Sequence, residues 1–122
     1  MAKAKRVLFV CEGNRHRSPT AERLYATTPG IRAKAAGLSD LARVQVTEEL
    51  LAWADAVFVM EQRLLGLLKR QFAESLVGKE LVCLDVPDDF QFEQPALIAL
   101  LTERLVPHLG QPGGRPSTVD GY

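Results

Sequence analysis

Hydrophobic residues along this chain occur in short continuous runs that alternate with segments of helical periodicity. Three continuous apolar runs stand out, at residues 7–10, 56–60 and 81–84. Runs of this length are typical of parallel strands that are buried on both faces. Residues 31–35 instead alternate apolar side chains with Arg32 and Lys34. This alternation predicts an edge strand with one solvated face, and Gly37 is expected to end it.

Between the predicted strands, apolar side chains return at helical spacing. Ser18 and Pro19 are a favoured N-cap and a favoured first helical residue, so they predict a helix start. Thr47 is expected to cap a short helix, and the last helix is expected to begin at Pro95 and end at Pro107. The apolar faces of the two later long helices comprise Leu64, Leu65, Leu68 and Phe72, and Leu97, Leu100, Leu101 and Leu105.

Strands that alternate with helices predict an open α/β fold, in which helices cover both faces of a parallel sheet. The chain of 122 residues has the length of one domain. We therefore expect a single domain at residues 1–109. Residues 110–122 are rich in glycine and proline, with few side chains that could pack, and are expected to form a flexible tail.

Composition and charge argue against several classes of protein. The 15 basic and 15 acidic residues give no net charge, which argues against a general nucleic-acid binder or membrane-surface protein. Only Cys11 and Cys83 occur, so the chain is not a disulfide scaffold. The first apolar run is too short for a signal peptide or a membrane span, and a cytoplasmic location is expected.

The residues that follow the first predicted strand carry the chemistry. Cys11 stands at the strand end, five residues precede Arg17, and Ser18 opens the helix. Such a loop presents backbone N–H groups to an anion at the carboxyl edge of the sheet, and the helix dipole supports them. The same field would stabilise a thiolate at Cys11. Gly13 and Asn14 are residue types that tolerate the positive φ of such a nest.

Arg17 and Ser18 fit the same chemistry. The guanidinium of Arg17 is a planar, permanently charged fork suited to two phosphate oxygens. The hydroxyl of Ser18 can donate a hydrogen bond to the thiolate, which would also improve it as a leaving group. The spacing therefore predicts a nucleophilic sulfur beneath a bound phosphoryl group.

Residues 7–22, VLFVCEGNRHRSPTAE, resemble the low-molecular-weight protein tyrosine phosphatases. Members of that family share a strand, the C-x5-R-S-P motif and a following Ala-Glu. Weaker similarities lie at Ala36-Gly37, at Trp53 to Glu61, and at Pro87 to Phe90. The resemblance implies a flavodoxin-like sheet of four parallel strands. It also implies hydrolysis of phosphomonoesters through a phosphocysteine intermediate, without a metal or cofactor, on a phosphorylated protein or small molecule.

Carried over position by position, the resemblance implies that Cys11 is the nucleophile and that Arg17 binds phosphate. It also implies that Asn14 holds the loop and that Ser18 assists the thiolate. The expected phosphate-binding residues are Glu12, Gly13, Asn14, Arg15, His16, Arg17 and Ser18.

The resemblance also points to the loop that would supply the acid. In that loop, the resemblance implies that Asp88 is the general acid that protonates the leaving oxygen and that Phe90 is an aromatic pocket wall. Asp89 and Asp85 are the alternative acids.

Three loop positions depart from the family pattern. Glu12 and Arg15 occupy places that are commonly apolar walls for an aromatic ring, and we expect the two charges to pair with each other. A substrate other than phosphotyrosine, including a phosphoramidate such as phosphoarginine, is compatible with this mouth. His16 stands where many members carry a second cysteine; a solvent-facing histidine is expected there, with a role as an extra acid as the alternative.

Two other functions share the motif. A thiol-based arsenate reductase relays oxidation through further cysteines, and only Cys83 is available, in a run that predicts a small buried side chain. A module that binds phosphate or a phosphoprotein without turnover would keep the same loop. The sequence does not predict an oligomeric state.

Overall fold

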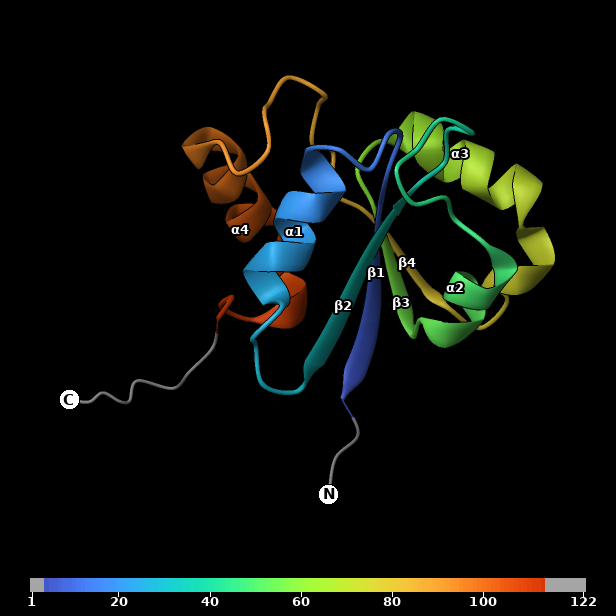
Figure 1. Cartoon of the computed structure of the whole chain (residues 1–122). Helices are drawn as coiled ribbons and strands as arrows, with labels where there is room; N and C mark the ends of the chain where they lie inside the picture. The colour runs from blue at the N-terminus through green and yellow to red at the C-terminus, as the bar shows by residue number, and fades with distance from the viewer. Residues whose placement is uncertain (1–3, 114–122) are drawn as a thin grey trace.

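The computed structural model describes residues 4–113, which form one sheet of four parallel strands flanked by helices (Figure 1). Across the sheet the strands are β2 (Ile31–Gly37), β1 (Lys5–Cys11), β3 (Ala56–Val59) and β4 (Glu80–Cys83). This confirms the predicted α/β fold with a flavodoxin-like parallel sheet. It also confirms that β2 is an edge strand.

Two layers of helices cover the sheet, one on each face (Figure 1). One layer holds α1 (Arg17–Tyr25) and α4 (Pro95–Leu109). The other holds α2 (Glu48–Trp53), α3 (Gln62–Gln71) and the 3₁₀ turn η1 (Ala73–Leu76). None of the helices in the described part of the chain is both long enough and apolar enough to cross a bilayer.

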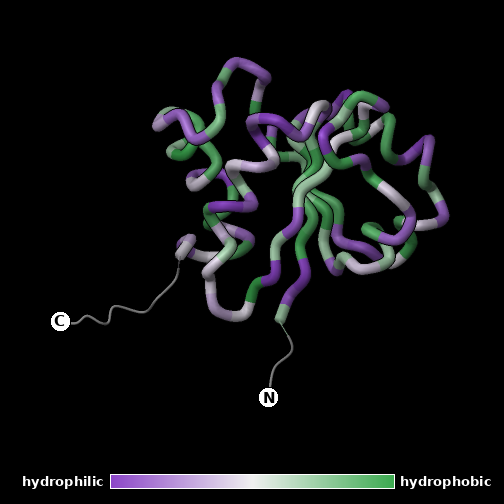
Figure 2. Tube along the Cα trace, viewed as in Figure 1, coloured by the Kyte–Doolittle hydropathy of each residue, from purple (hydrophilic) through white to green (hydrophobic). Residues whose placement is uncertain are grey.

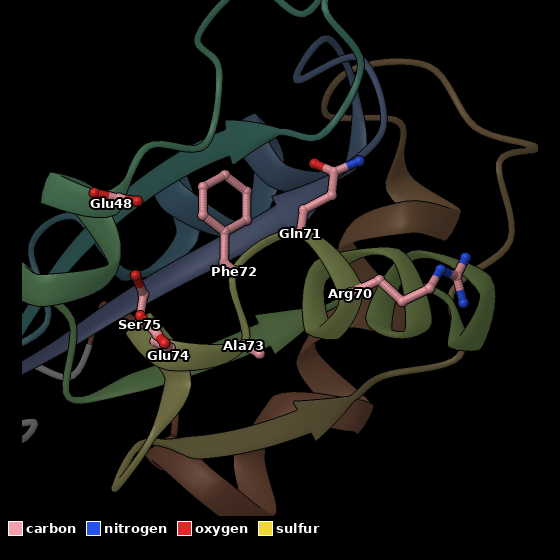
Figure 3. A pocket seen from close by; sticks show the side chains of 7 residues that line it. All are labelled: Glu48, Arg70, Gln71, Phe72, Ala73, Glu74 and Ser75. Carbon is pink, nitrogen blue, oxygen red and sulfur yellow. The ribbon is translucent and has the colours of Figure 1, made fainter.

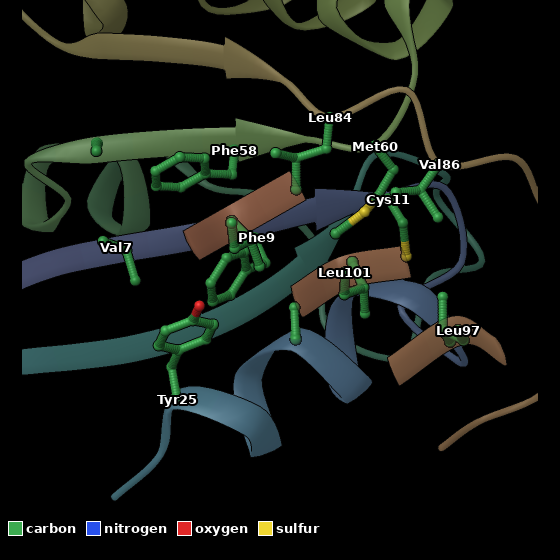
Figure 4. Close-up of a cluster of buried hydrophobic side chains, with 13 residues drawn as sticks. Val7, Phe9, Cys11, Tyr25, Phe58, Met60, Leu84, Val86, Leu97 and Leu101 are labelled. Atoms are coloured by element: carbon green, nitrogen blue, oxygen red, sulfur yellow. The ribbon is translucent and has the colours of Figure 1, made fainter. Parts of the chain in front are cut away.

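Side chains of β1 alternate between the two layers because successive strand residues point to opposite faces. Val7, Phe9 and Cys11 pack in the cluster beneath α1 and α4, which Figure 4 shows. Leu8 and Val10 pack in the cluster on the α2 and α3 side. All five are buried, as the continuous apolar run predicts. Figure 2 shows the same organisation, with hydrophobic strands at the centre and hydrophilic stretches outside.

Helix α1 begins earlier than predicted. It starts at Arg17, with His16 at the N-cap, rather than with Ser18 as the cap of a helix that starts at Pro19. The reason is that the Ser18 hydroxyl is occupied in the loop, where it contacts Cys11 Sγ and Asn14 Nδ2. The predicted cap of α2 is confirmed, since Leu50 N–H donates to Thr47 Oγ1 at 3.1 Å.

Two further predictions are wrong, one about the burial of a strand and one about the end of a helix. The run at residues 81–84 was expected to be buried, yet Leu81, Val82 and Cys83 are only half-buried because β4 lies at the other edge of the sheet. Helix α4 continues past Pro107 to Leu109. Gly110 ends it with φ of 78°, a conformation that glycine adopts without strain.

The predicted tail begins against α1. The Gly110 carbonyl accepts a hydrogen bond from Tyr25 Oη at 2.8 Å, and Gly113 N–H donates to Thr28 Oγ1 at 2.8 Å. The prediction of flexibility for residues 114–122 lies outside the described residues.

Candidate functional site

The loop between Cys11 and Ser18 lies at the carboxyl edge of the sheet, where β1 leads into α1 (Figure 1). Its turn depends on Asn14, whose φ is 54°. The sequence offered both Gly13 and Asn14 for the positive φ, and only Asn14 adopts it. Asparagine tolerates this left-handed conformation better than most residues. Asn14 is also fully buried, so its side chain is part of the loop's interior.

Two groups contact the sulfur of Cys11, a residue that is 2% exposed. Ser18 Oγ lies 2.9 Å from Cys11 Sγ, and Asn14 N–H donates to the same sulfur at 3.1 Å. Asn14 Nδ2 in turn donates to Ser18 Oγ at 2.8 Å. The serine oxygen accepts from the amide and also lies 3.4 Å from the carbonyl of Ala36, so its hydrogen can be directed to the sulfur or to that carbonyl. The sulfur thus lies within hydrogen-bond distance of one backbone N–H and one hydroxyl.

Most backbone N–H groups of the loop are free to bind an anion. Among the described residues, the N–H groups at positions 12, 13, 15, 16, 17 and 18 donate to no protein atom. Consecutive N–H groups without protein acceptors at a helix start are the components of an anion nest.

The carbonyl groups of the loop are held by the segment that follows β2, which we call the bracing loop (residues 38–43). Leu38 and Ser39 N–H donate to the carbonyls of Cys11 and Glu12, both at 3.0 Å. Arg43 N–H donates to Gly13 O at 3.1 Å, and Arg43 Nε donates to Asn14 O at 3.1 Å. With its carbonyls bound on one side, the loop keeps its N–H groups for a ligand.

Gly37 allows this close approach at the end of β2. A Cβ atom at this position would lie 2.4 Å from Glu12 O, 2.8 Å from Ala42 Cβ and 3.0 Å from Asn14 N. The first two distances are impossible without movement of the loop. The absence of a side chain at Gly37 therefore determines how closely the edge strand and the loop pack.

The guanidinium of Arg17 is the only buried positive charge among the described residues, with 2% exposure. Its Nη1 donates to Glu61 Oε2 and, at 2.8 Å, to the carbonyl of Val86. Its Nε lies 3.7 Å from Asp88 Oδ1. Within residues 4–113, Nη2 makes no hydrogen bond, so one arm of the fork remains available to an anion.

Glu61 and Arg63 extend the charge network to the rim of the loop. Arg63 Nη2 lies 3.6 Å from Glu61 Oε1 and donates to Glu12 Oε1 at 2.9 Å. The expectation that Glu12 pairs with Arg15 is therefore wrong: Glu12 pairs with Arg63, which reaches it from the start of α3. Both Glu12 and Arg15 are exposed.

The segment after β4 brings one of the three candidate acids to Arg17. Asp88 contacts the guanidinium and its side chain is 59% exposed, so it is accessible to a ligand. Asp85 instead accepts a hydrogen bond from Cys83 Sγ at 3.4 Å. Asp89 is exposed, and no ion pair within the described residues involves it. Phe90 is half-buried against the α1 and α4 cluster.

His16 and Cys83 lie outside the contacts around the sulfur. His16 is half-buried, and its Nδ1 has no hydrogen-bond partner in the described part of the chain. Burial raises the pKa of the Cys83 thiol, whereas a hydrogen bond with the Asp85 backbone lowers it. Within residues 4–113, no three His, Cys, Asp or Glu side chains are grouped as a metal site would require.

The two cysteines lie on opposite faces of the sheet. Cys83 is in register with Val59, and Val59 with Val10, so these three side chains share the α2 and α3 face. Cys11 follows Val10 and points to the other face. Two strand spacings, roughly 9–10 Å, also separate them. A disulfide needs Cα atoms within about 7 Å, so no direct bridge forms without rearrangement.

A separate hollow of about 400 Å³ opens between α2 and the segment from the end of α3 to η1 (Figure 3). Its lining includes Glu48, Phe72 and Ser75, and none of the predicted site residues. The predicted site residues therefore lie outside this hollow.

Similarity to known proteins is found among solved structures. No family model matches the sequence, and no curated protein matches it. Solved structures do match. The low-molecular-weight protein tyrosine phosphatase from Streptococcus pyogenes aligns over 85% of this chain and 93% of its own, at 18% identity and a TM-score of 0.69. The fold is that of the low-molecular-weight protein tyrosine phosphatases.

Two other structures with this fold are named for different phosphatase activities. The tyrosine phosphatase Wzb from Escherichia coli K30, solved in complex with phosphate, covers 83% of this chain and 93% of its own, at 22% identity and a TM-score of 0.67. The YwlE arginine phosphatase from Geobacillus stearothermophilus covers 82% and 85%, at 24% identity and a TM-score of 0.64. The phosphatase fold alone therefore leaves the substrate open.

Four residues with structural roles at this site were not predicted to be site residues: Gly37, Arg43, Glu61 and Arg63. One signal was present for Glu61. It follows β3, whose carboxyl end lies beside that of β1, and polar residues at that edge are positioned to reach a shared ligand. Arg43 and Arg63 carried no such signal, because their contacts depend on the path of loops and side chains.

Proposed function

We propose that this chain is a cysteine-dependent phosphatase that hydrolyses phosphomonoesters, phosphotyrosine or a related ester, through a phosphocysteine intermediate. One observation carries the proposal. Cys11 Sγ lies at the base of a loop of free N–H groups, with the Ser18 hydroxyl at 2.9 Å and the Asn14 N–H at 3.1 Å. The tyrosine phosphatase activity for which Wzb is named supports a phosphomonoester as the substrate.

In the first step, the loop N–H groups and Arg17 Nη2 bind the phosphoryl oxygens, and the Cys11 thiolate attacks phosphorus. An S–P bond forms as the P–O bond to the leaving group breaks. Asp88, in its protonated form, gives its proton to the leaving oxygen. The N–H groups and the guanidinium stabilise the charge that accumulates on the equatorial oxygens.

In the second step, water attacks the phosphocysteine. The Asp88 carboxylate accepts a proton from this water, the S–P bond breaks, and inorganic phosphate leaves. The hydroxyl of Ser18 stabilises the sulfur as its negative charge returns. Every step uses groups of this chain, and a reducing cytoplasm would keep Cys11 as the thiol that the cycle requires.

The experiment is hydrolysis of a generic aryl phosphate by the purified protein, with a chelator present, beside Cys11→Ser. We expect the wild type to release phosphate and the variant to lose at least about 10³-fold in rate while it still binds inorganic phosphate. Cys83→Ser, on the other face of the sheet, is the matched control and should retain the rate. Hydrolysis preserved in Cys11→Ser would remove the cysteine from the mechanism. Binding without turnover in the wild type would indicate a phosphate-binding module instead.

A further inference from the structure

A hollow of about 400 Å³ lies directly beside the loop from Cys11 to Ser18, which we call the phosphate loop. Its walls come from the loop itself, from the first turns of α1, from the end of the bracing loop and from the segment before α4. The lining residues are Arg15, Pro19, Glu22, Arg23, Arg43 and Phe92. Because Arg15 belongs to both the hollow and the phosphate loop, a group in the hollow would be a close neighbour of a bound phosphoryl group.

The hollow carries an excess of positive charge. Arg15 and Arg43 are exposed, and neither lies within 4.0 Å of a carboxylate in the described part of the chain. Arg23 is already paired, at 3.3 Å, with Glu93. The one acidic lining residue is Glu22, which is half-buried. Burial raises the pKa of its carboxyl group, and the Arg43 charge opposes that rise. Two arginines therefore face one carboxylate.

Arg43 is held in place by the phosphate loop. Its backbone N–H and its Nε donate to two consecutive loop carbonyls, Gly13 O and Asn14 O, both at 3.1 Å. A guanidinium has five donors, so the Nη groups of Arg43 remain for another acceptor. Since a fixed arginine loses less conformational entropy when it binds, this position suits recognition of an anion.

One apolar side chain is exposed in the hollow, and two more are exposed within two residues of Arg43 in the sequence. Phe92, in the hollow, is 41% exposed. Leu41 and Val44, beside Arg43 in sequence, are 81% and 42% exposed. Exposed apolar side chains next to unpaired arginines are typical of surfaces that contact a polypeptide.

We propose that this hollow binds an acidic side chain next to the phosphorylated residue of a protein substrate. The inference rests on the proposed function, and it names the substrate class: phosphoproteins whose phosphorylated site has acidic neighbours. Arg15 and Arg43 would pair with the acidic group, and Phe92 would pack against the adjoining peptide. The phosphate loop recognises the phosphoryl group, and the hollow discriminates between sequences.

The test uses the full chain with Cys11→Ser, so that binding is measured without turnover. Three phosphotyrosine peptides are compared that differ only in whether the neighbouring residues are glutamate, alanine or lysine. We expect the glutamate peptide to bind about fivefold or more tightly than the alanine peptide, as two partly exposed ion pairs allow. The lysine peptide should bind more weakly than both, and 0.5 M salt should reduce the differences.

Added to the Cys11→Ser background, Arg15→Gln and Arg43→Gln should each reduce the ratio of the affinity for the glutamate peptide to the affinity for the alanine peptide. The ratio is the readout, since it cancels any general weakening of the phosphate loop, and Arg43→Lys should restore part of it. Arg32→Gln, an exposed arginine on β2 outside the hollow, is the matched control and should leave the ratio unchanged.

Equal affinity for all three peptides, or no binding of any, would overturn the inference. A small bisphosphate that binds more tightly than its monophosphate while the peptides do not differ would overturn the assignment to proteins. The proposed function is tested separately by aryl phosphate hydrolysis. A protein that hydrolyses the aryl ester without peptide preference loses only this inference, and one that prefers the acidic peptide without hydrolysis loses only the phosphatase assignment.

Discussion

The carboxylates of Glu61 and Asp88 both lie beside the guanidinium of Arg17, but they differ in exposure and in distance from it. A guanidinium that is 2% exposed needs acceptors from the protein, because the loss of water would otherwise cost several kcal/mol. Glu61 and the Val86 carbonyl supply them. Asp88 is 59% exposed and 3.7 Å away, so it contributes little to holding the arginine. Asp88 therefore remains accessible to a ligand, as its proposed role of general acid requires.

Asp88→Asn removes that proton without a change in size. We expect the rate to fall by about 10²–10⁴-fold for an ester with a basic leaving group, and far less for an ester of an acidic phenol, which leaves unprotonated. The measurement is kcat against the pKa of the leaving phenol, and the variant should show the steeper dependence. Asp89→Asn is the control. A larger loss in that control would move the acid assignment from Asp88 to Asp89.

Glu61→Gln tests whether Glu61 anchors Arg17. The variant keeps one oxygen acceptor and loses the charge, so the free energy of unfolding should fall by about 1–3 kcal/mol. Bound phosphate would supply the missing negative charge. Inorganic phosphate should therefore raise the melting temperature of Glu61→Gln more than that of the wild type. An equal rise in both proteins would contradict an anchoring role.

At the scale of elements, β2 and the bracing loop serve the phosphate loop more than they serve the core. The first four residues of β2 are exposed or half-buried, whereas Ala35, Ala36 and Gly37 are buried where the strand meets the loop. Small side chains at these positions let the two segments approach, and the bracing loop then binds four consecutive carbonyls. The edge strand thus determines the shape of a loop that precedes it in sequence.

Gly37→Ala should distort the phosphate loop, because its Cβ would lie 2.4 Å from Glu12 O. We expect weaker phosphate binding by about tenfold or more and a lower melting temperature, measured by titration and by thermal unfolding. Gly66→Ala is a matched control on α3, where the nearest atom would be a flexible arginine nitrogen at 3.6 Å. Alanine is the better helix former, so that variant should gain about 0.5–1 kcal/mol. Undiminished phosphate binding in Gly37→Ala would disprove the packing argument.

The sequence predicted elements well where local physics decides them. The apolar runs, the edge strand, the Thr47 cap and the Pro95 start all follow from side-chain pattern and capping chemistry. The start of α1 did not, because tertiary contacts recruit the serine that would have capped it. The network of Arg63 and Arg43 also escaped prediction, since contacts over 51 and 29 positions leave no local pattern.

At the scale of the whole molecule, Tyr25 links α1 to the end of α4. It is fully buried, and its hydroxyl donates to Gly110 O at 2.8 Å. Burial raises the pKa of Tyr25 to about 12 from 10.0. The folded state thus favours the neutral phenol, and this contribution to stability is complete below pH 10. It is lost as the pH rises toward 12.

Tyr25→Phe removes both the hydrogen bond and this pH dependence. At pH 8 the variant should be less stable than the wild type by about 1 kcal/mol. At pH 11 ionisation of Tyr25 in the unfolded wild type lowers the stability of the wild type by a similar amount, so the gap should largely disappear. Urea unfolding of both proteins at the two pH values measures the difference. A gap that stays constant would mean that the phenol titrates equally in both states.

The bracing loop has a consequence for the dynamics of this molecule. The amide hydrogens of Leu38, Ser39 and Arg43 are bonded to the carbonyls of residues 11–13, so they exchange with solvent only when the two loops separate. Hydrogen exchange at these three amides therefore reports whether the phosphate loop is ordered, although none of them belongs to it. A ligand that orders the phosphate loop would therefore slow exchange at these three amides, although it need not contact them.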